Sequence, residues 1–218
     1  MITRHWPLSI VLSLSFLAGA TDAGAQAQSR EQALQALSNA DAQVRSQAAG
    51  RLAEVGVMAD TPALLRALKD EDETTRERAE QAAWQIWSRS GDARVDKLYQ
   101  TGVAQMNDGE LHKSIATFTH VIQLKPGFAE GWNKRATLYY LVGENRKSLA
   151  DCAQVIKRNP NHFGALAGYG QLYLRLEDYQ RALTYFQRAL EVNPNMDGVR
   201  RNILLLEQII EQRRRNMV

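Results

Sequence analysis

Three short phrases with a proline at a fixed spacing decide the fold of this chain: Leu124-Lys125-Pro126, Arg158-Asn159-Pro160-Asn161 and Val192-Asn193-Pro194-Asn195. The prolines follow one another at intervals of 34 residues. Periods of roughly 20 to 50 residues are typical of solenoids, which stack one supersecondary unit on the next. Proline cannot donate the next backbone hydrogen bond of a helix, so each phrase is expected to end a helix and close a unit. The units are 95–128, 129–162 and 163–196.

The same positions of the three units carry the same kinds of side chain. The eighth and twentieth positions are always small: Gly102, Ala136 and Gly170, then Ser114, Ser148 and Ala182. The twenty-fourth position holds Phe118, Cys152 and Phe186, and the turns inside the units contain Asn107-Asp108-Gly109, Val142-Gly143-Glu144 and Leu176-Glu177-Asp178. Small residues let two antiparallel helices approach closely, while large residues fill the space between neighbouring pairs. The pattern therefore predicts three stacked helix pairs.

This pattern resembles the tetratricopeptide repeat (TPR), with its aromatic-x2-Leu-small-x2-Tyr, small-x3-Phe and closing-proline arrangement. The sequence departs from it at Thr101 and Arg135, where leucine is usual, and at Gln105, where tyrosine is usual. These departures are expected to weaken single contacts without breaking the period. The resemblance implies an all-α fold, an α-solenoid of antiparallel helix pairs. A solenoid needs a cap, and residues 197–212 are predicted to form a capping helix, followed by a basic, solvated tail at 213–218.

A second period of 31 residues occupies the part of the chain before the first unit. Asp41-Ala42-Gln43-Val44-Arg45 recurs as Asp72-Glu73-Thr74-Thr75-Arg76. Residues 29–91 therefore resemble two HEAT repeats, in which an aspartate caps the second helix and an arginine reaches a neighbouring aspartate. For this chain the resemblance implies a ladder of Asp41, Arg45, Asp72 and Arg76. Two helix pairs are fewer than the roughly three repeats that stand alone. The two sections are therefore predicted to stack as one continuous solenoid, joined by Trp84, Ile86 and Trp87.

Residues 1–25 have the features of a secretory signal peptide. Arg4 precedes an apolar run from Leu8 to Ala20, and Ala23-Gly24-Ala25 supplies a small-x-small cleavage pattern. Cleavage after Ala25 would leave a periplasmic or secreted protein; cleavage after Ala20 and an uncleaved anchor are the alternatives. The apolar run of 13 residues is shorter than the roughly 20 that a membrane-spanning helix needs. No membrane span is expected after removal of the leader.

Composition and motifs argue against catalysis, metal binding and nucleic-acid binding. The formal net charge is only +3, with no broad basic face expected. His5, His112, His120 and His162 do not group with one another or with cysteine at a metal-ligand spacing. The single cysteine, Cys152, excludes an internal disulfide and is predicted to be a small buried residue. No nucleophile phrase or phosphate loop is present. The sequence therefore predicts a protein without enzymatic activity and without cofactors.

The resemblance to TPR proteins implies that the first helix of each pair lines a concave groove. The residues predicted to hold a partner there are Tyr99, Val103, Asn107, Asn133, Lys134, Thr137, Tyr140, Gln171 and Arg175. For Tyr99 and Tyr140, packing between helices is an equally open alternative. The resulting hypothesis is a non-enzymatic scaffold or adaptor in the cell envelope that binds another protein or peptide in this groove. The alternative is an accessory subunit that docks onto an envelope enzyme or assembly complex through the HEAT-like face.

Overall fold

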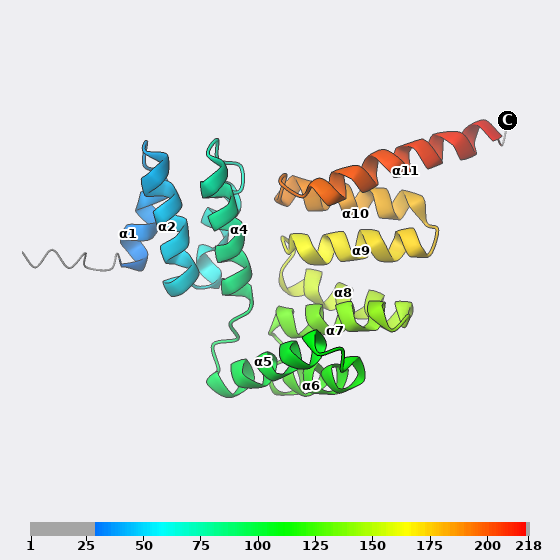
Figure 1. The fold of residues 1–218 in the computed structure, drawn as a ribbon, viewed down its shortest axis with the longest axis horizontal. Coiled ribbons are helices and arrows are strands. Elements are labelled where there is room, and N and C mark those ends of the chain that lie inside the picture. Colours follow the sequence, from blue (N-terminus) through cyan, green and yellow to red (C-terminus); the bar gives the residue numbers. More distant parts are fainter. Residues whose placement is uncertain (1–28, 217–218) are drawn as a thin grey trace, which may run out of the picture.

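The computed structural model describes residues 29–216, and this part of the chain is built from helices and their connections (Figure 1). The prediction of an all-α helical solenoid is confirmed. The elements are α1 (Arg30–Ala36), α2 (Ala42–Val55), the short 3-10 helix η1 (Met58–Asp60), α3 (Thr61–Ala67), α4 (Glu73–Trp87), α5 (Ala93–Asn107), α6 (Leu111–Leu124), α7 (Ala129–Leu141), α8 (Asn145–Arg158), α9 (Phe163–Arg175), α10 (Tyr179–Val192) and α11 (Asp197–Asn216). The predicted leader lies outside the described residues. None of the described helices has the length and apolar character needed to span a membrane.

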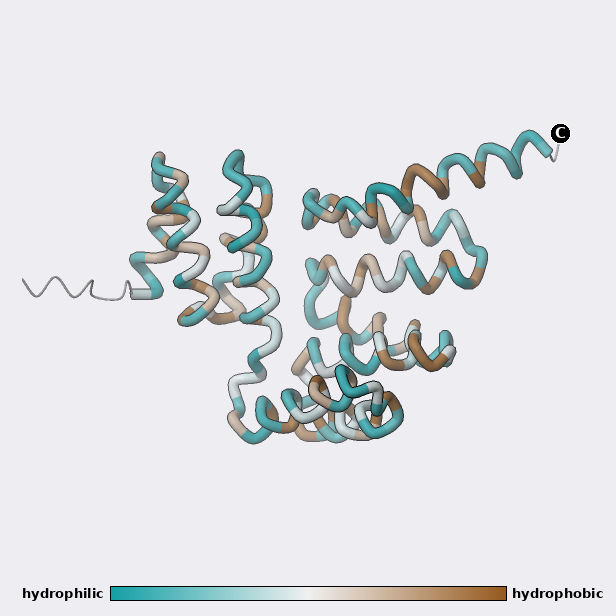
Figure 2. Tube along the Cα trace, in the orientation of Figure 1, coloured by the Kyte–Doolittle hydropathy of each residue, from teal (hydrophilic) through white to brown (hydrophobic). Residues whose placement is uncertain are grey.

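Residues 93–192, the repeat section, contain the pairs α5/α6, α7/α8 and α9/α10. The small residues at the eighth and twentieth positions face each other inside a pair, as their size requires. The Ser114 hydroxyl donates to the Gly102 carbonyl at 2.8 Å, and the Ser148 hydroxyl donates to the Ala136 carbonyl at 2.7 Å. Both serines are buried, and each satisfies a hydroxyl that would otherwise be costly in the core. Figure 2 shows apolar segments alternating with hydrophilic ones along the helices, as expected for stacked amphipathic pairs.

Residues 30–87, the N-terminal section, form two further helix pairs, α1/α2 and α3/α4. The aspartates cap the second helices as the sequence suggests: Asp41 accepts from the Gln43 N–H, and Asp72 accepts from the Thr75 N–H. The predicted ladder is wrong about the aspartate that Arg45 contacts. Arg45 makes two hydrogen bonds of 2.8 Å to Asp70, which precedes the α4 cap, and not to Asp72. Asp72 is already engaged at the start of its own helix, so its carboxylate faces the backbone.

The N-terminal section does not continue the stack of repeat pairs, so the predicted single solenoid is corrected. Figure 1 shows α4 standing beside the row of repeat helices and crossing their ends, instead of lying on α5 and α6 as one more layer. Trp84 and Trp87 do join the two sections, through rings packed on His162 and Phe163 at the start of α9. Ile86 is instead buried within the N-terminal core.

Polar contacts fix the other end of the same interface. The Asn193 amide donates to Glu80 of α4 at 3.0 Å, and the Asn195 amide donates to the Leu68 carbonyl at 2.8 Å. Both asparagines flank Pro194, so one of the proline phrases that ends a repeat unit also carries the contact with the N-terminal section.

Helix α11 covers the last pair and is longer than predicted. It continues to Asn216, so the residues expected to form a solvated tail begin inside the helix. Arg213 lies over the Tyr179 ring, 4.4 Å from its centroid, and its guanidinium is 3.4 Å from Glu177. The contact with α10 and the turn before it extends the cap by about one helical turn.

Candidate functional site

The first helices of the three repeat pairs, α5, α7 and α9, form one wall, and the predicted site residues lie on it. α4 covers the part of this wall near the helix starts. The Gly164 backbone at the start of α9 lies against Trp84, because an added Cβ at Gly164 would be 2.4 Å from the indole Cη2. Near the helix ends Thr137 and Arg175 are exposed, and Tyr140 and Gln171 are partly exposed. The predicted groove is therefore open over its second half only.

Tyr99 belongs to the covered half of the wall, where it packs between helices instead of facing a partner. The side chain is 3% exposed, and its ring packs edge-on against Phe118 and Phe128. Its hydroxyl donates to Ser88 at the end of α4 at 3.4 Å. Burial, together with the nearby negative charge of Glu130, raises the pKa of Tyr99 well above its usual range. Tyr99 is thus a contact between the two sections and is not available to a partner.

A buried polar cluster beside Tyr99 holds Asn133 and Lys134, which the sequence assigned to the groove. At its centre is Glu130, which is fully buried. Asn133 donates to both Glu130 carboxylate oxygens at 3.1 Å, and the Lys134 ammonium is 3.3 Å from one of them. The cluster therefore already occupies the Asn133 amide and offsets the charge of Lys134.

His162 completes the cluster, and its hydrogen bonds determine which ring nitrogen carries the proton. Its Nδ1 accepts a hydrogen bond from the Ala165 N–H at 3.1 Å, so in the neutral ring the proton is on Nε2. Nε2 lies 2.8 Å from Glu130 and donates to the carboxylate. Burial opposes ionisation of Glu130, but the hydrogen bonds from His162 and Asn133 and the charge of Lys134 outweigh it and lower the pKa of Glu130.

Sequence reasoning missed this cluster. It assigned Asn133 and Lys134 to the open groove and left His162 without a partner. The one available signal was the position of His162 directly before a helix, where a side-chain acceptor caps the first N–H groups.

The open half of the wall is built around Tyr140 and Arg175. The Arg175 guanidinium lies 3.5 Å from the centroid of the Tyr140 ring and donates to the Tyr140 carbonyl at 2.7 Å. Its other acceptor is the neutral side chain of Asn145, at 3.3 Å. Within residues 29–216, Arg175 has no carboxylate partner and Gln171 makes no side-chain hydrogen bond. The Gln171 amide is therefore free to meet a ligand, and Arg175 presents a positive charge that an acidic ligand could offset.

Val103 and Asn107, predicted on the first unit, do not join this open half. Val103 packs in the apolar cluster of α5 and α6, and Asn107 is exposed at the last residue of α5. The residues that the structure brings together around one hollow are Asn133, Thr137, Tyr140 and Gln171.

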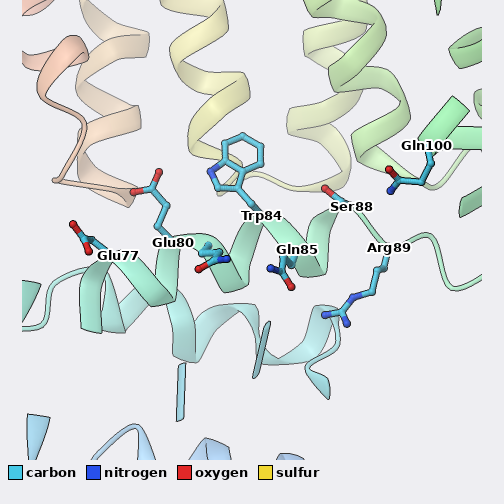
Figure 3. A pocket seen from close by; sticks show the side chains of 8 residues that line it. Glu77, Glu80, Trp84, Gln85, Ser88, Arg89 and Gln100 are labelled. Atoms are coloured by element: carbon cyan, nitrogen blue, oxygen red, sulfur yellow. The ribbon is translucent and has the colours of Figure 1, made fainter. Parts of the chain in front are cut away.

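Two hollows flank the contact between Trp84 and Gly164. The smaller, of about 120 Å³, lies between α7 and α9 and has Thr137, Tyr140, Gly168 and Gln171 at its rim. The larger, of about 660 Å³, lies along α4 and reaches Gln100 on α5. Figure 3 shows Trp84 rising from α4 between Glu80 and Ser88, which also line the larger hollow. Among residues 29–216 no group of three or more histidine, cysteine or acidic side chains could hold a metal ion.

Comparison with known proteins supports the repeat assignment. Residues 167–196 match the tetratricopeptide repeat family model. A TPR repeat-containing protein of Rhizobium etli is 33% identical over 108 residues, which cover 50% of this chain and 53% of the relative. The small glutamine-rich tetratricopeptide repeat-containing protein of Dictyostelium discoideum is 26% identical over 124 residues, 56% of this chain and 37% of that protein. The matched stretch is thus about half or less of these relatives' own length.

Solved structures show the same fold at low identity. The Sgt2 TPR domain from Aspergillus fumigatus gives a TM-score of 0.54 at 24% identity, covering 57% of this chain and 83% of that one. The first TPR of Spaghetti (RPAP3), solved bound to an HSP90 peptide, gives 0.53 at 19% identity, covering 55% and 96%. Residues 167–196 thus match a tetratricopeptide repeat, and the helix pairs of the repeat section have the same fold as these tetratricopeptide domains.

Proposed function

We propose that this protein is a non-enzymatic adaptor that holds a peptide segment of a partner protein against the open half of the α5–α7–α9 wall. The observation that carries the proposal is the hollow between α7 and α9. Gln171, which makes no side-chain hydrogen bond within residues 29–216, lines it, and Arg175, whose charge no carboxylate of these residues offsets, lies over Tyr140 at its rim. A rigid helical wall suits this role, since binding then costs little ordering of the receptor. The RPAP3 domain of similar fold was solved with a bound peptide, which supports the same use of the fold here.

A pair of matched threonine variants tests the proposal. Thr137 on the wall and Thr184 on α10 are both exposed, and each hydroxyl donates to the carbonyl four residues earlier, at 3.1 and 3.0 Å. Peptides selected from a random phage library on the purified wild-type chain serve as the probe, with affinity measured by fluorescence anisotropy. Thr137→Arg should weaken the selected peptides at least 10-fold, whereas Thr184→Arg should leave them unchanged. Equal affinity of both variants would place the binding surface elsewhere.

We further propose that the adaptor works outside the cytoplasm, in the periplasm or as a secreted protein. The support is the charged start, apolar run and small-x-small pattern of residues 1–25. Cell fractionation followed by N-terminal sequencing of the recovered protein should give Gln26 as the first residue. Recovery from the cytoplasm with Met1 or Ile2 intact would contradict this location.

A further inference from the structure

The floor of the hollow between α7 and α9 is a place where the second unit lacks the large side chain that the first and third units have. In the first and third units a phenylalanine of the second helix lies against a glycine of the first. An added Cβ at Gly102 would be 2.8 Å from the Phe118 ring, and one at Gly170 would be 2.4 Å from the Phe186 ring. The second unit has Ala136 and Cys152 at these positions. The second unit therefore has the small Cys152 side chain in place of a phenylalanine ring, and Ala136 adds only one methyl group in place of glycine. Side-chain volume is thus missing between the two helices of this unit alone.

The chemistry of the floor is apolar. Ala136, Cys152 and Leu172 are buried and line the hollow. Ser148 also lines it, but its hydroxyl is committed to the Ala136 carbonyl at 2.7 Å. Burial raises the pKa of the Cys152 thiol to about 12, so the side chain stays neutral and behaves as a small apolar group. A floor of this kind offers a ligand dispersion contacts and no charge.

The size of the hollow selects the occupant. An apolar cavity of roughly 150 Å³ in a protein core binds benzene. The hollow here is about 120 Å³, which fits one aliphatic side chain better than an aromatic ring. It opens to solvent beside Gly168, where an added Cβ would meet no atom within 4 Å, so a peptide backbone can pass close to α9. Gln171 lies one turn further along α9, in reach of that backbone.

The charge at the rim adds a second requirement. Tyr140 lines the hollow and lies under Arg175, whose positive charge no carboxylate of residues 29–216 offsets. A carboxylate next to the anchored side chain would supply the missing partner. We propose that this hollow is an anchor pocket for one aliphatic side chain of a partner peptide that also carries an acidic residue close to the anchor. This proposal rests on the proposed function, because it names the ligand of the same wall.

A double substitution that copies the other two units tests the pocket without creating a new kind of core. Ala136→Gly with Cys152→Phe restores the glycine–phenylalanine pair and should fill the hollow while keeping wild-type helicity by circular dichroism. The probes are the phage-selected peptides and their single-position variants. On the wild-type chain one position should require Val, Ile, Leu or Met, and its change to Ala should weaken binding about 10- to 100-fold, as expected for the loss of a buried side chain. The double variant should lose the same factor and become indifferent to that position.

Two further variants keep the test decisive if the double variant folds poorly. Cys152→Ala enlarges the floor and should shift the preferred anchor towards a larger side chain. Arg175→Gln should weaken peptides with an acidic neighbour several-fold at low salt and leave their amide analogues unchanged. If Thr137→Arg abolishes binding while filling or enlarging the floor changes nothing, the anchor pocket is refuted and the binding wall stands. If Thr137→Arg has no effect either, both proposals fail together.

Discussion

Two glycines of α9 show how the same residue type serves different purposes within one turn of helix. Gly170 lies under the Phe186 ring, and an added Cβ would be 2.4 to 2.8 Å from three ring atoms. Gly168 faces the open wall, where an added Cβ would touch nothing within 4 Å. Gly170 is therefore required for the approach of α9 and α10. Gly168 is not required for packing, although glycine in a helix costs about 1 kcal/mol relative to alanine.

These surroundings predict opposite effects of the same substitution. Gly170→Ala should lower the free energy of unfolding by up to about 2 kcal/mol, because an overpacking cost of about 1–3 kcal/mol exceeds the gain of about 1 kcal/mol in helix propensity. Gly168→Ala should raise the free energy of unfolding by about 0.5–1 kcal/mol. Urea unfolding of both variants, followed by circular dichroism, measures the two changes. Destabilisation of similar size in both would mean that the Phe186 contact does not govern this helix.

Residue-level prediction succeeded where the repeat register alone fixes the environment and failed where polar side chains of different helices meet. The register places the small eighth and twentieth residues inside each pair, as the buried Ser114 and Ser148 hydroxyls show. Arg135 was expected to weaken a contact, yet its guanidinium makes two hydrogen bonds to Asp151, at 2.7 and 2.9 Å. An ion pair between side chains 16 residues apart depends on the rotamers of both, which no periodicity specifies.

At the scale of the elements, the pairing of α2 with α4 depends on Arg45. Its guanidinium reaches the two Asp70 oxygens, and it also donates to the carbonyls of Asn39 and Ala40 at the end of the preceding turn. Both side chains of the ion pair are almost covered, with 9% and 12% exposure. Glu71 is a second acidic neighbour of Arg45 at 3.3 Å, but its side chain is 86% exposed. Water screens the second contact far more than the first.

The ion pair gives the N-terminal section a defined pH dependence. The hydrogen bonds from Arg45 outweigh burial and hold the pKa of Asp70 below its usual value. As the pH falls, the unfolded chain therefore binds a proton at Asp70 at a higher pH than the folded chain does. The stabilisation is complete above the unfolded value of about 3.9 and disappears as the pH falls through the lower folded value.

Asp70→Asn should accordingly lower the urea midpoint at pH 7, and its difference from the wild-type protein should shrink as the pH falls below about 4. Glu71→Gln is the matched control, because it removes the exposed partner of the same arginine and should change the midpoint little. Urea titrations between pH 7 and pH 3 give all three curves. A gap between Asp70→Asn and wild type that stays constant down to pH 3 would exclude an ionised Asp70 as the source of the stabilisation.

Helix starts were predictable where a side chain caps the first turn. The aspartate caps of α2 and α4 follow directly from Asp41 and Asp72. The end of α11 did not follow, since Arg213 to Arg215 suggested a solvated tail. Cations in the last turn favour a helix C-terminus, and the Tyr179 ring gives Arg213 a contact that a single-helix pattern cannot reveal.

At the scale of the whole molecule, the N-terminal section braces the edge of the repeat section. Because the chain turns at residues 88–92, α4 faces the starts of α9 and α11, which come more than 70 residues later in the sequence. The period predicted amphipathic pairs and the tryptophans predicted an interface, but neither determines the angle at which two sections meet. Trp84 and Trp87 lie one turn apart on α4 and fit the turn before α9, so this contact replaces end-to-end stacking.

The brace predicts that the N-terminal section depends on the repeat section for its stability. The Trp87 ring stacks on His162 at 4.5 Å, and the Trp84 ring packs edge-on against Phe163 at 5.2 Å. Truncation of a buried tryptophan such as Trp87 costs about 3–5 kcal/mol, and loss of the partly buried Trp84 adds to this cost. Two helix pairs are also fewer than a solenoid usually needs to stand alone. Trp84→Ala with Trp87→Ala should therefore abolish slow amide exchange in residues 30–87 while leaving protection in α9 and α10.

Hydrogen–deuterium exchange with mass spectrometry reads the two sections separately in the full chain. Trp132→Ala is the control, because this tryptophan belongs to the repeat section, where its ring contacts Arg135 and Arg158 and its indole N–H donates to the Pro126 carbonyl. It should leave exchange in residues 30–87 at the wild-type level. If the double variant keeps that protection, the N-terminal helix pairs fold by themselves and the edge contact only positions them. If protection is lost together in residues 30–87 and 163–192, the two sections form one cooperative unit instead of a brace and its support.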